Sequence, residues 1–287
     1  MKLTIKLLAL SAGVLAMASC GGSKEHDNTS ETADTASTVI RDTTPVTVND
    51  TTKFKFDFAI ANIPSPASSL QDLGKWNAPY DNSILNDAAK ASSYSTEFQR
   101  SVNLGVYNID MAYAMVSDKG QDVLQYMKPI LTTSDALGLK GALSSMIGKR
   151  AESNLNNKDS LFGILDEIFV KSDSYLRTNE RVYTAALVFA GSWIESLYLT
   201  CKISETVTDP ALKEKAHKHL WEQRFHLGNL INLLGDYKDK KECAELIKEL
   251  KPIHEEITAI KQPSEMSDAK FKSISEKIYA VRNKLTK

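Results

Sequence analysis

Two stretches of helix length, Val102–Val116 and Ala185–Cys201, are apolar on nearly every side. A helix at the surface of a bundle keeps a polar face toward water, so a helix without one belongs at the centre, covered by amphipathic neighbours. After the first sixty residues we find no convincing strand pattern, and one strand cannot make a sheet. The sequence therefore predicts an all-α, multi-helix bundle with these two stretches at its centre.

Turn-forming residues divide the chain into successive helices. Asp209 before Pro210 is a strong start signal, because Asp caps free backbone N–H groups and proline suits the first helical position. The helices Arg181–Ser204 and Pro210–Leu234 should therefore pack as an antiparallel hairpin. Asp159, Thr178 and Ser267 are further expected caps. The expected breaks are Gly120, Leu137-Gly138, Asn156-Asn157, Thr178-Asn179, Thr208-Asp209-Pro210, Gly235-Asp236 and Gln262-Pro263.

A short sequence motif occurs in both apolar stretches. Ile109-Asp110-Met111-Ala112-Tyr113 matches Ile194-Glu195-Ser196-Leu197-Tyr198, and a glycine, Gly105 or Gly191, stands a few positions upstream of each. Self-similarity of this kind is typical of a duplicated structural unit. A match of so few residue types also arises by coincidence. Two duplicated helical units and chance similarity therefore both stay open.

The N-terminus has the three regions of a secretory signal. Lys2 and Lys6 precede the apolar run Leu7–Ala16, and small residues stand directly before Cys20. The apolar run is about half as long as a bilayer-spanning helix, which predicts that residues 1–19 are a cleaved signal peptide. The later apolar stretch Ala185–Cys201 contains Glu195, so we do not expect it to be a permanent span.

The run Met17-Ala18-Ser19-Cys20 resembles the lipobox of bacterial lipoproteins, whose cysteine receives a diacylglycerol and becomes the mature N-terminus. The family usually has Leu where this chain has Met17. The resemblance implies lipid attachment at Cys20, with palmitate among the acyl chains, and a place in the cell envelope. Gly21 stands where Asp would signal inner-membrane retention, which favours the outer membrane, facing either the periplasm or the cell exterior. The alternative is an ordinary secretory signal with an incidental cysteine.

The chain from Gly21 to about Thr52 is rich in Thr, Ser, Asp and Asn. Such a segment cannot bury enough apolar surface to offset its ordering entropy. We therefore expect residues 20–52 to form a lipidated, disordered tether and residues 53–287 to form the helical domain. Alternating apolar residues at the start of this domain predict a short extended arm; they are Phe54, Phe56, Phe58 and Ile60.

The stretches Asn103–Tyr113 and Ala190–Tyr198 resemble segments of uncharacterised all-helical lipoproteins of Gram-negative bacteria. The resemblance covers most of the chain after Phe54. It implies a helical fold and an envelope location, and it brings no activity or catalytic residue with it.

Asp110 and Glu195 are the main candidate site residues, because each interrupts an otherwise apolar helix. A lone ionised carboxylate is costly to bury, so each acid needs a partner, a proton or a polar cavity. A hydrogen-bonded structural network is one interpretation. An acid/base site of the kind used in glycoside hydrolysis is another. The third is a ligand pocket around the two acids, lined by Tyr107, Tyr113, Trp193 and Tyr198.

His219, Glu222 and His226 form the most metal-like group in the sequence. At about 100° per residue they fall within roughly 60° of one another on a single helix face. The chain lacks the carboxylates that di-iron bundles recruit from all four helices, so hydrogen bonding at the rim of the apolar face is the alternative. Cys201 and Cys243 are expected to be free and buried, because the intervening helix separates them.

The sequence excludes some functions. The formal net charge is -1 and no helix concentrates Lys and Arg, so we expect no nucleic-acid binding. There is no phosphate-binding glycine loop and no G-x-S-x-G elbow.

The prediction is a lipid-anchored envelope protein with a non-enzymatic binding or scaffolding domain. We expect no cofactor; the partners would be the membrane, through Cys20, and a protein or small ligand. The alternative is a ligand-binding or metal-binding protein or a hydrolase, with its site around Asp110 and Glu195 or around His219, Glu222 and His226.

Overall fold

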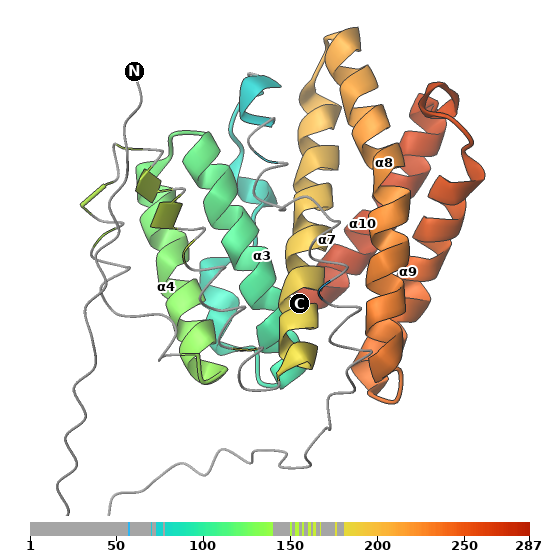
Figure 1. Ribbon diagram of the computed structural model, residues 1–287. Helices are drawn as coiled ribbons and strands as arrows, with labels where there is room; N and C mark the ends of the chain where they lie inside the picture. Colours follow the sequence, from blue (N-terminus) through green and yellow to red (C-terminus); the bar gives the residue numbers. More distant parts are fainter. Residues whose placement is uncertain are drawn as a thin grey trace, which may run out of the picture. The chain divides into compact units, whose positions relative to one another are not determined.

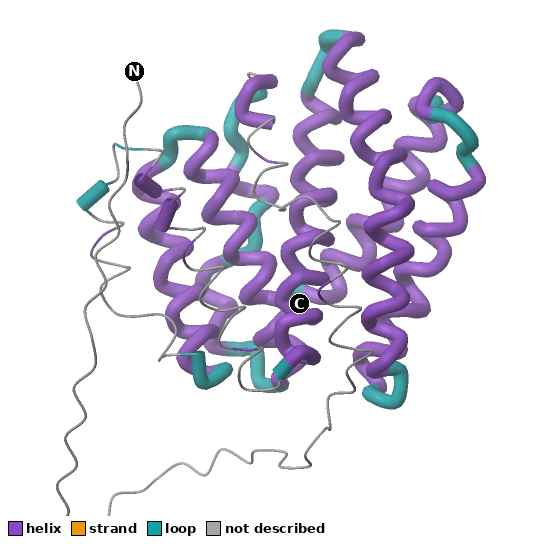
Figure 2. Tube along the Cα trace, in the orientation of Figure 1, coloured by secondary structure: helices purple, strands orange, loops and turns teal. Residues whose placement is uncertain are grey.

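The computed structural model describes residues 78–139 and 181–287 continuously, together with residues 57, 70, 73–76, 150, 153, 154, 157, 160, 161, 163, 164, 167 and 176. The chain divides into two units, Met1–Pro45 and Val46–Lys287, and all described residues belong to the second. Figure 2 shows them as helices joined by short loops, and no β-strand occurs among them. The predicted all-α, multi-helix fold is confirmed.

The first hairpin consists of α3 (Glu97–Val116) and α4 (Gly120–Ala136), which pack against each other (Figure 1). α3 begins at a capping box, in which the Thr96 hydroxyl accepts from the N–H of Gln99 and the Gln99 side chain accepts from the N–H of Thr96. It ends in a Schellman turn, with Asp118 in the left-handed conformation at φ 59°. The turn reverses the chain directly into α4.

Short 3₁₀ turns precede this hairpin: η1 (Gly74–Trp76), η2 (Asn82–Ile84) and η3 (Ala88–Ser92). Asp81 and Asp87 cap η2 and η3 by accepting from backbone N–H groups two residues further on. η3 packs against both α3 and α4. The segment between the first turns and α3 is therefore held against the first hairpin.

Two further hairpins follow: α7 (Val182–Thr206) with α8 (Pro210–Leu234), and α9 (Lys241–Ala259) with α10 (Asp268–Leu285). Asp209 caps α8 by accepting from the N–H of Ala211, and the Ser267 hydroxyl caps α10 by accepting from Lys270. Both predicted caps and the predicted breaks around them are confirmed. The short turns η4 (Gly235–Tyr237) and η5 (Pro263–Glu265) lie between these helices.

α3 and α7 run parallel and side by side at the centre of the bundle (Figure 1). Glu97 and Thr184 share a hydrogen bond near their first turns, and Asp110 and Glu195 meet further along. The backbones come closest at two glycines. A Cβ on Gly105 would clash with the carbonyl oxygen of Val188, and a Cβ on Gly191 with that of Val102. Only glycine permits this approach.

The close approach is reciprocal, because the same sequence offset relates Val102 to Val188 and Gly105 to Gly191. Each of the two central helices also continues into its own hairpin partner, α4 or α8. A duplicated helical unit would leave this approximate two-fold relation. The duplication itself stays a prediction.

The two central helices are the most buried elements, as predicted. Residues 101–115 of α3 are all buried. Among the described helices, α7 is the one long and apolar enough to cross a membrane, and 94% of its most apolar window is buried inside the bundle. The sequence prediction did not expect this stretch to be a span, because it contains Glu195. Its length and composition nevertheless meet the criteria for a membrane-spanning helix. A core helix meets the same criteria, so this is weak evidence for a span.

Some predicted features lie outside the described residues. These are the signal peptide (1–19), Cys20, the tether (20–52), the proposed caps Asp159 and Thr178, and the extended arm around Phe54–Ile60 apart from Asp57. Asp57 has a helical backbone conformation.

Candidate functional site

A buried, bidentate ion pair joins the C-terminal helix to the centre of the bundle. Arg282 of α10 donates from Nε to Oε2 of Glu195 and from Nη2 to Oε1, both at 2.9 Å. Glu195 is 0% exposed and Arg282 7%. The guanidinium also lies 4.4 Å from the ring centroid of Tyr198. Burial lowers the pKa of Arg282, but the charge and hydrogen bonds of Glu195 outweigh this and raise it above its ordinary value.

Asp110 of α3 adds a second carboxyl group to this ion pair. Its Oδ2 accepts from the backbone N–H of Asn86 at 3.1 Å. Complete burial raises the pKa of Asp110 well above its usual range, and the charge of Glu195 raises it further, against the lowering effect of Arg282. The protonated form is therefore favoured. A proton on the Asp110 carboxyl group can be donated to the side chain of Glu195, with which Asp110 shares a hydrogen bond.

Asn86 organises the polar shell around these groups. Its Nδ2 donates to Tyr94 Oη at 3.1 Å and to Asn103 Oδ1 at 3.2 Å, and its carbonyl oxygen accepts from Tyr126 at 2.9 Å. Asn103 in turn donates to the carbonyl of Leu285, at the end of α10. The network thus ties five parts of the fold together: the segment before α3, then α3, α4, α7 and α10. This arrangement supports the structural-network interpretation of the two acids.

Two of the four aromatic residues expected around the acids do lie there. Tyr198 stacks against Arg282. Tyr107 is fully buried, with its ring centroid 6.4 Å from that of Tyr94 and 6.2 Å from that of Tyr126. Its hydroxyl donates to the carbonyl of Asp87. Both rings are buried beside the network, and neither lines the surface pocket described below.

The other two aromatic residues lie elsewhere. Trp193 donates from Nε1 to Gln223 of α8 at 3.1 Å. It is two residues from Glu195, and two residues turn a helix by about 200°, so the two side chains point in nearly opposite directions. Tyr113 lies near the end of α3 and lines a surface pocket. The predicted single pocket around both acids is therefore split between three environments.

Arg282 and Asn86 are the important residues that the sequence interpretation missed. Arg282 carried a usable signal, because it stands four residues after Ile278 and eight after Ile274 on the apolar stripe of α10. A cation on a buried stripe requires a buried anion. Asn86 lies in a segment without helical periodicity, and no sequence pattern indicated its role.

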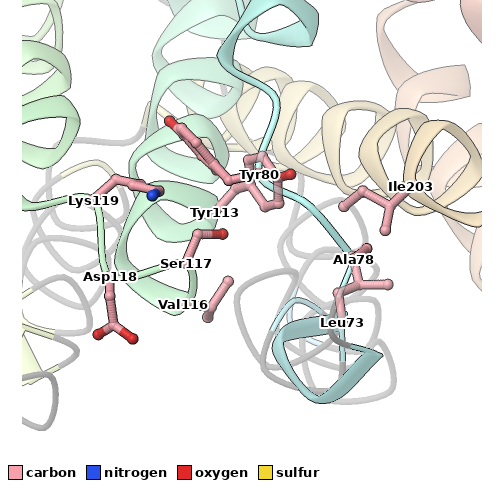
Figure 3. Close-up of a pocket in the computed structure, with 9 residues that line it drawn as sticks. All are labelled: Leu73, Ala78, Tyr80, Tyr113, Val116, Ser117, Asp118, Lys119 and Ile203. Carbon is pink, nitrogen blue, oxygen red and sulfur yellow. The ribbon is translucent and has the colours of Figure 1, made fainter. Parts of the chain in front are cut away.

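A pocket of about 320 Å³ opens beside the end of α3, within the size range of small-molecule sites. Figure 3 shows two tyrosines at its centre, Tyr80 and Tyr113, whose ring centroids are 5.0 Å apart. The Tyr80 hydroxyl donates to Asp122 at 2.6 Å, and Lys119 Nζ lies 5.5 Å from the Tyr80 centroid. The lining residues are Leu73, Ala78, Tyr80, Tyr113, Val116, Ser117, Asp118, Lys119 and Ile203.

The proposed metal group does not assemble. Among the described residues, no three His, Cys, Asp or Glu side chains are placed to hold a metal ion. His219 lies 3.5 Å from Gln223, and Glu222 pairs with Lys218 at 3.9 Å on the exposed face of α8. Burial lowers the pKa of His226, which favours its neutral form. These contacts fit hydrogen bonding at the helix rim.

Cys201 and Cys243 are free and buried, as predicted. The Cys243 thiol donates to the carbonyl of Leu234 at 3.4 Å. Burial raises the pKa of Cys201 to about 12 and that of Cys243 to about 11. Both therefore stay as unreactive thiols at neutral pH.

We compared the chain with protein-family models, with curated proteins and with solved structures, and none of the three comparisons found a match. No family is therefore assigned. The proposals that follow rest on the residues of this chain.

Proposed function

We propose that this chain is a lipid-anchored protein of the cell envelope whose helical domain binds a partner or small ligand and catalyses no reaction. The anchor is Cys20, on the outer membrane, and the domain stands off from the lipid on the segment 20–52. The sequences of the signal peptide and the lipobox support this location.

The observation that carries the non-enzymatic part is the enclosure of the two acids. Asp110 and Glu195 are both 0% exposed, and Arg282 closes over Glu195 through both carboxylate oxygens. A general acid or base has to reach the atom whose proton it transfers. Carboxyl groups in this position hold α3, α7 and α10 together, and they meet no substrate.

The proposed lipid anchor and location are tested by expressing the full chain and Cys20→Ser in a Gram-negative host fed with labelled palmitate. The chain with Cys20 should take up label and fractionate with the outer membrane, and the variant should do neither. Uptake of label by the variant, or a secreted, unlabelled wild type, would contradict the anchor.

The binding role is tested by native mass spectrometry of the gently purified full chain, followed by crosslinking in intact cells. We expect a retained small molecule or a specific crosslinked partner. Turnover in a broad hydrolase screen that is lost on Glu195→Gln at unchanged melting temperature would contradict the proposal, because a buried structural acid cannot have that effect.

A further inference from the structure

The pocket beside the end of α3 has two chemically different sides. Aliphatic side chains from two parts of the chain form one side: Leu73 and Ala78 before α3, and Ile203 of α7. Tyr113, Ser117 and Lys119 form the other. Figure 3 shows Leu73, Ala78 and Ile203 on one side of the opening and Ser117 and Lys119 on the other, where Val116 lies below Ser117. A ligand that fills both sides must itself be amphiphilic.

The polar side offers hydrogen-bond donors. Lys119 brings an ammonium group and Ser117 a hydroxyl that faces Tyr113 in Figure 3. The Tyr113 oxygen accepts from the N–H of Asp81 at 3.4 Å, which leaves its own proton to donate. Burial raises the pKa of Tyr113, so this proton is retained. Three donors of which one is cationic favour an anionic acceptor.

The acids nearby do not cancel this preference. Asp122 accepts the Tyr80 hydroxyl. Asp118 lines the pocket, but its carboxylate points away from the tyrosines in Figure 3. The left-handed backbone at Asp118 sits between Ser117 and Lys119 and lets both of those neighbours line the pocket. The turn thus places Ser117, Asp118 and Lys119 along the pocket, with the Asp118 carboxylate directed away from the two tyrosines.

We propose that this pocket binds a small amphiphilic carboxylate. Its head group meets Lys119, Ser117 and Tyr113, and its hydrocarbon body lies against the aliphatic side. The inference rests on the proposed binding function and names the ligand class.

The test uses the full chain carrying Cys20→Ser, because a lipidated chain would need detergent, itself an amphiphile that competes for the pocket. Binding of octanoate and of its neutral analogue octanamide is measured by isothermal titration calorimetry. We expect octanoate to bind about tenfold more tightly than octanamide, the preference of a charge-assisted hydrogen bond over a neutral one. Lys119→Met should remove this preference and leave octanamide binding unchanged.

The matched control is Lys128→Met, on the exposed surface of α4 outside the pocket, which makes the same change of charge and should leave octanoate binding intact. As a second variant, Ala78→Trp should abolish binding of both probes by filling the aliphatic side. Absence of octanoate binding to the wild type, or equal loss in both lysine variants, overturns the proposal. If the wild type does not bind octanoate but retains another ligand or partner by mass spectrometry, only the carboxylate assignment fails. If the wild type binds no octanoate and retains no ligand or partner, the proposed binding function fails too.

Discussion

At the residue scale, Arg282 is one buried cation facing two buried carboxyl groups. Glu195 holds it through both oxygens, whereas Asp110 reaches only one backbone N–H and the side chain of Glu195. Two ionised acids beside one guanidinium would leave an uncompensated charge in the core, which is expensive. The proton therefore belongs on Asp110, and the triad carries no net charge.

The first prediction concerns Asp110→Asn, which imitates the protonated acid in shape and hydrogen bonding. Because the folded-state pKa of Asp110 lies above its ordinary value of 3.8, the wild type loses stability as the pH rises from there through the folded-state pKa. Asn does not titrate. The stability of the variant relative to the wild type should therefore increase from pH 5 to pH 8, measured by urea unfolding. Asp239→Asn, at an exposed position, is the control, and a relative stability that falls with pH would contradict the protonated acid.

The second prediction is that Arg282→Met destabilises the protein by about 3–5 kcal/mol at pH 7, because it leaves Glu195 buried without a counter-ion. Lys272→Met, on the exposed face of the same helix, should change stability by less than about 0.5 kcal/mol. Both values come from urea unfolding. Similar effects of the two substitutions would show that the buried ion pair does not hold α10 in place.

The sequence identified Asp110 and Glu195 because an acid in an apolar helix is conspicuous. It did not identify their partner, because Arg282 lies 87 residues from Glu195 and only the tertiary fold joins them. Trp193 was predicted to lie beside the two acids, and the reason that it lies elsewhere is local to α7. Its separation from Glu195 puts it on the opposite face of α7, so helix geometry alone could have excluded it from the site.

At the scale of elements, the glycine crossing fixes how α3 and α7 pack. The third prediction is that Gly105→Ala and Gly191→Ala each cost at least about 3 kcal/mol, since the added methyl group meets backbone that cannot move aside. Gly235→Ala is the control. It has open space and a helical φ of -58°, so it should stabilise by about 0.5–1 kcal/mol. Tolerance of Ala at position 105 in thermal unfolding would rule out the close approach.

Helix positions were predictable because glycine, proline and capping residues act locally. Asp209 and Ser267 cap the helices that they were expected to cap. The parallel pairing of α3 and α7 was not predicted, although Gly105 and Gly191 were noticed, because a repeated motif does not reveal which helix faces touch. Pairing of distant helices depends on contacts that become visible only in the fold.

At the scale of the whole domain, α10 links the third hairpin to the centre. It packs on α9, α7 and α3, and its end receives hydrogen bonds from Asn103 and Lys90. If these contacts make one cooperative unit, no hairpin opens alone. The two buried thiols report on this, because Cys201 lies in the central helix α7 and Cys243 in the outer hairpin.

The fourth prediction is that Cys201 and Cys243 react with iodoacetamide at the same slow rate in the full chain carrying Cys20→Ser. Neither thiol can ionise or meet reagent until its helix opens, so a common rate means that both are exposed by global unfolding. In Arg282→Met, Cys243 should react faster than Cys201, because the outer hairpin has lost its buried anchor. Mass spectrometry of the alkylated peptides over time gives both rates. A faster Cys243 in the unsubstituted chain would mean that the outer hairpin opens by itself, and that the ion pair between Arg282 and Glu195 does not couple it to the centre.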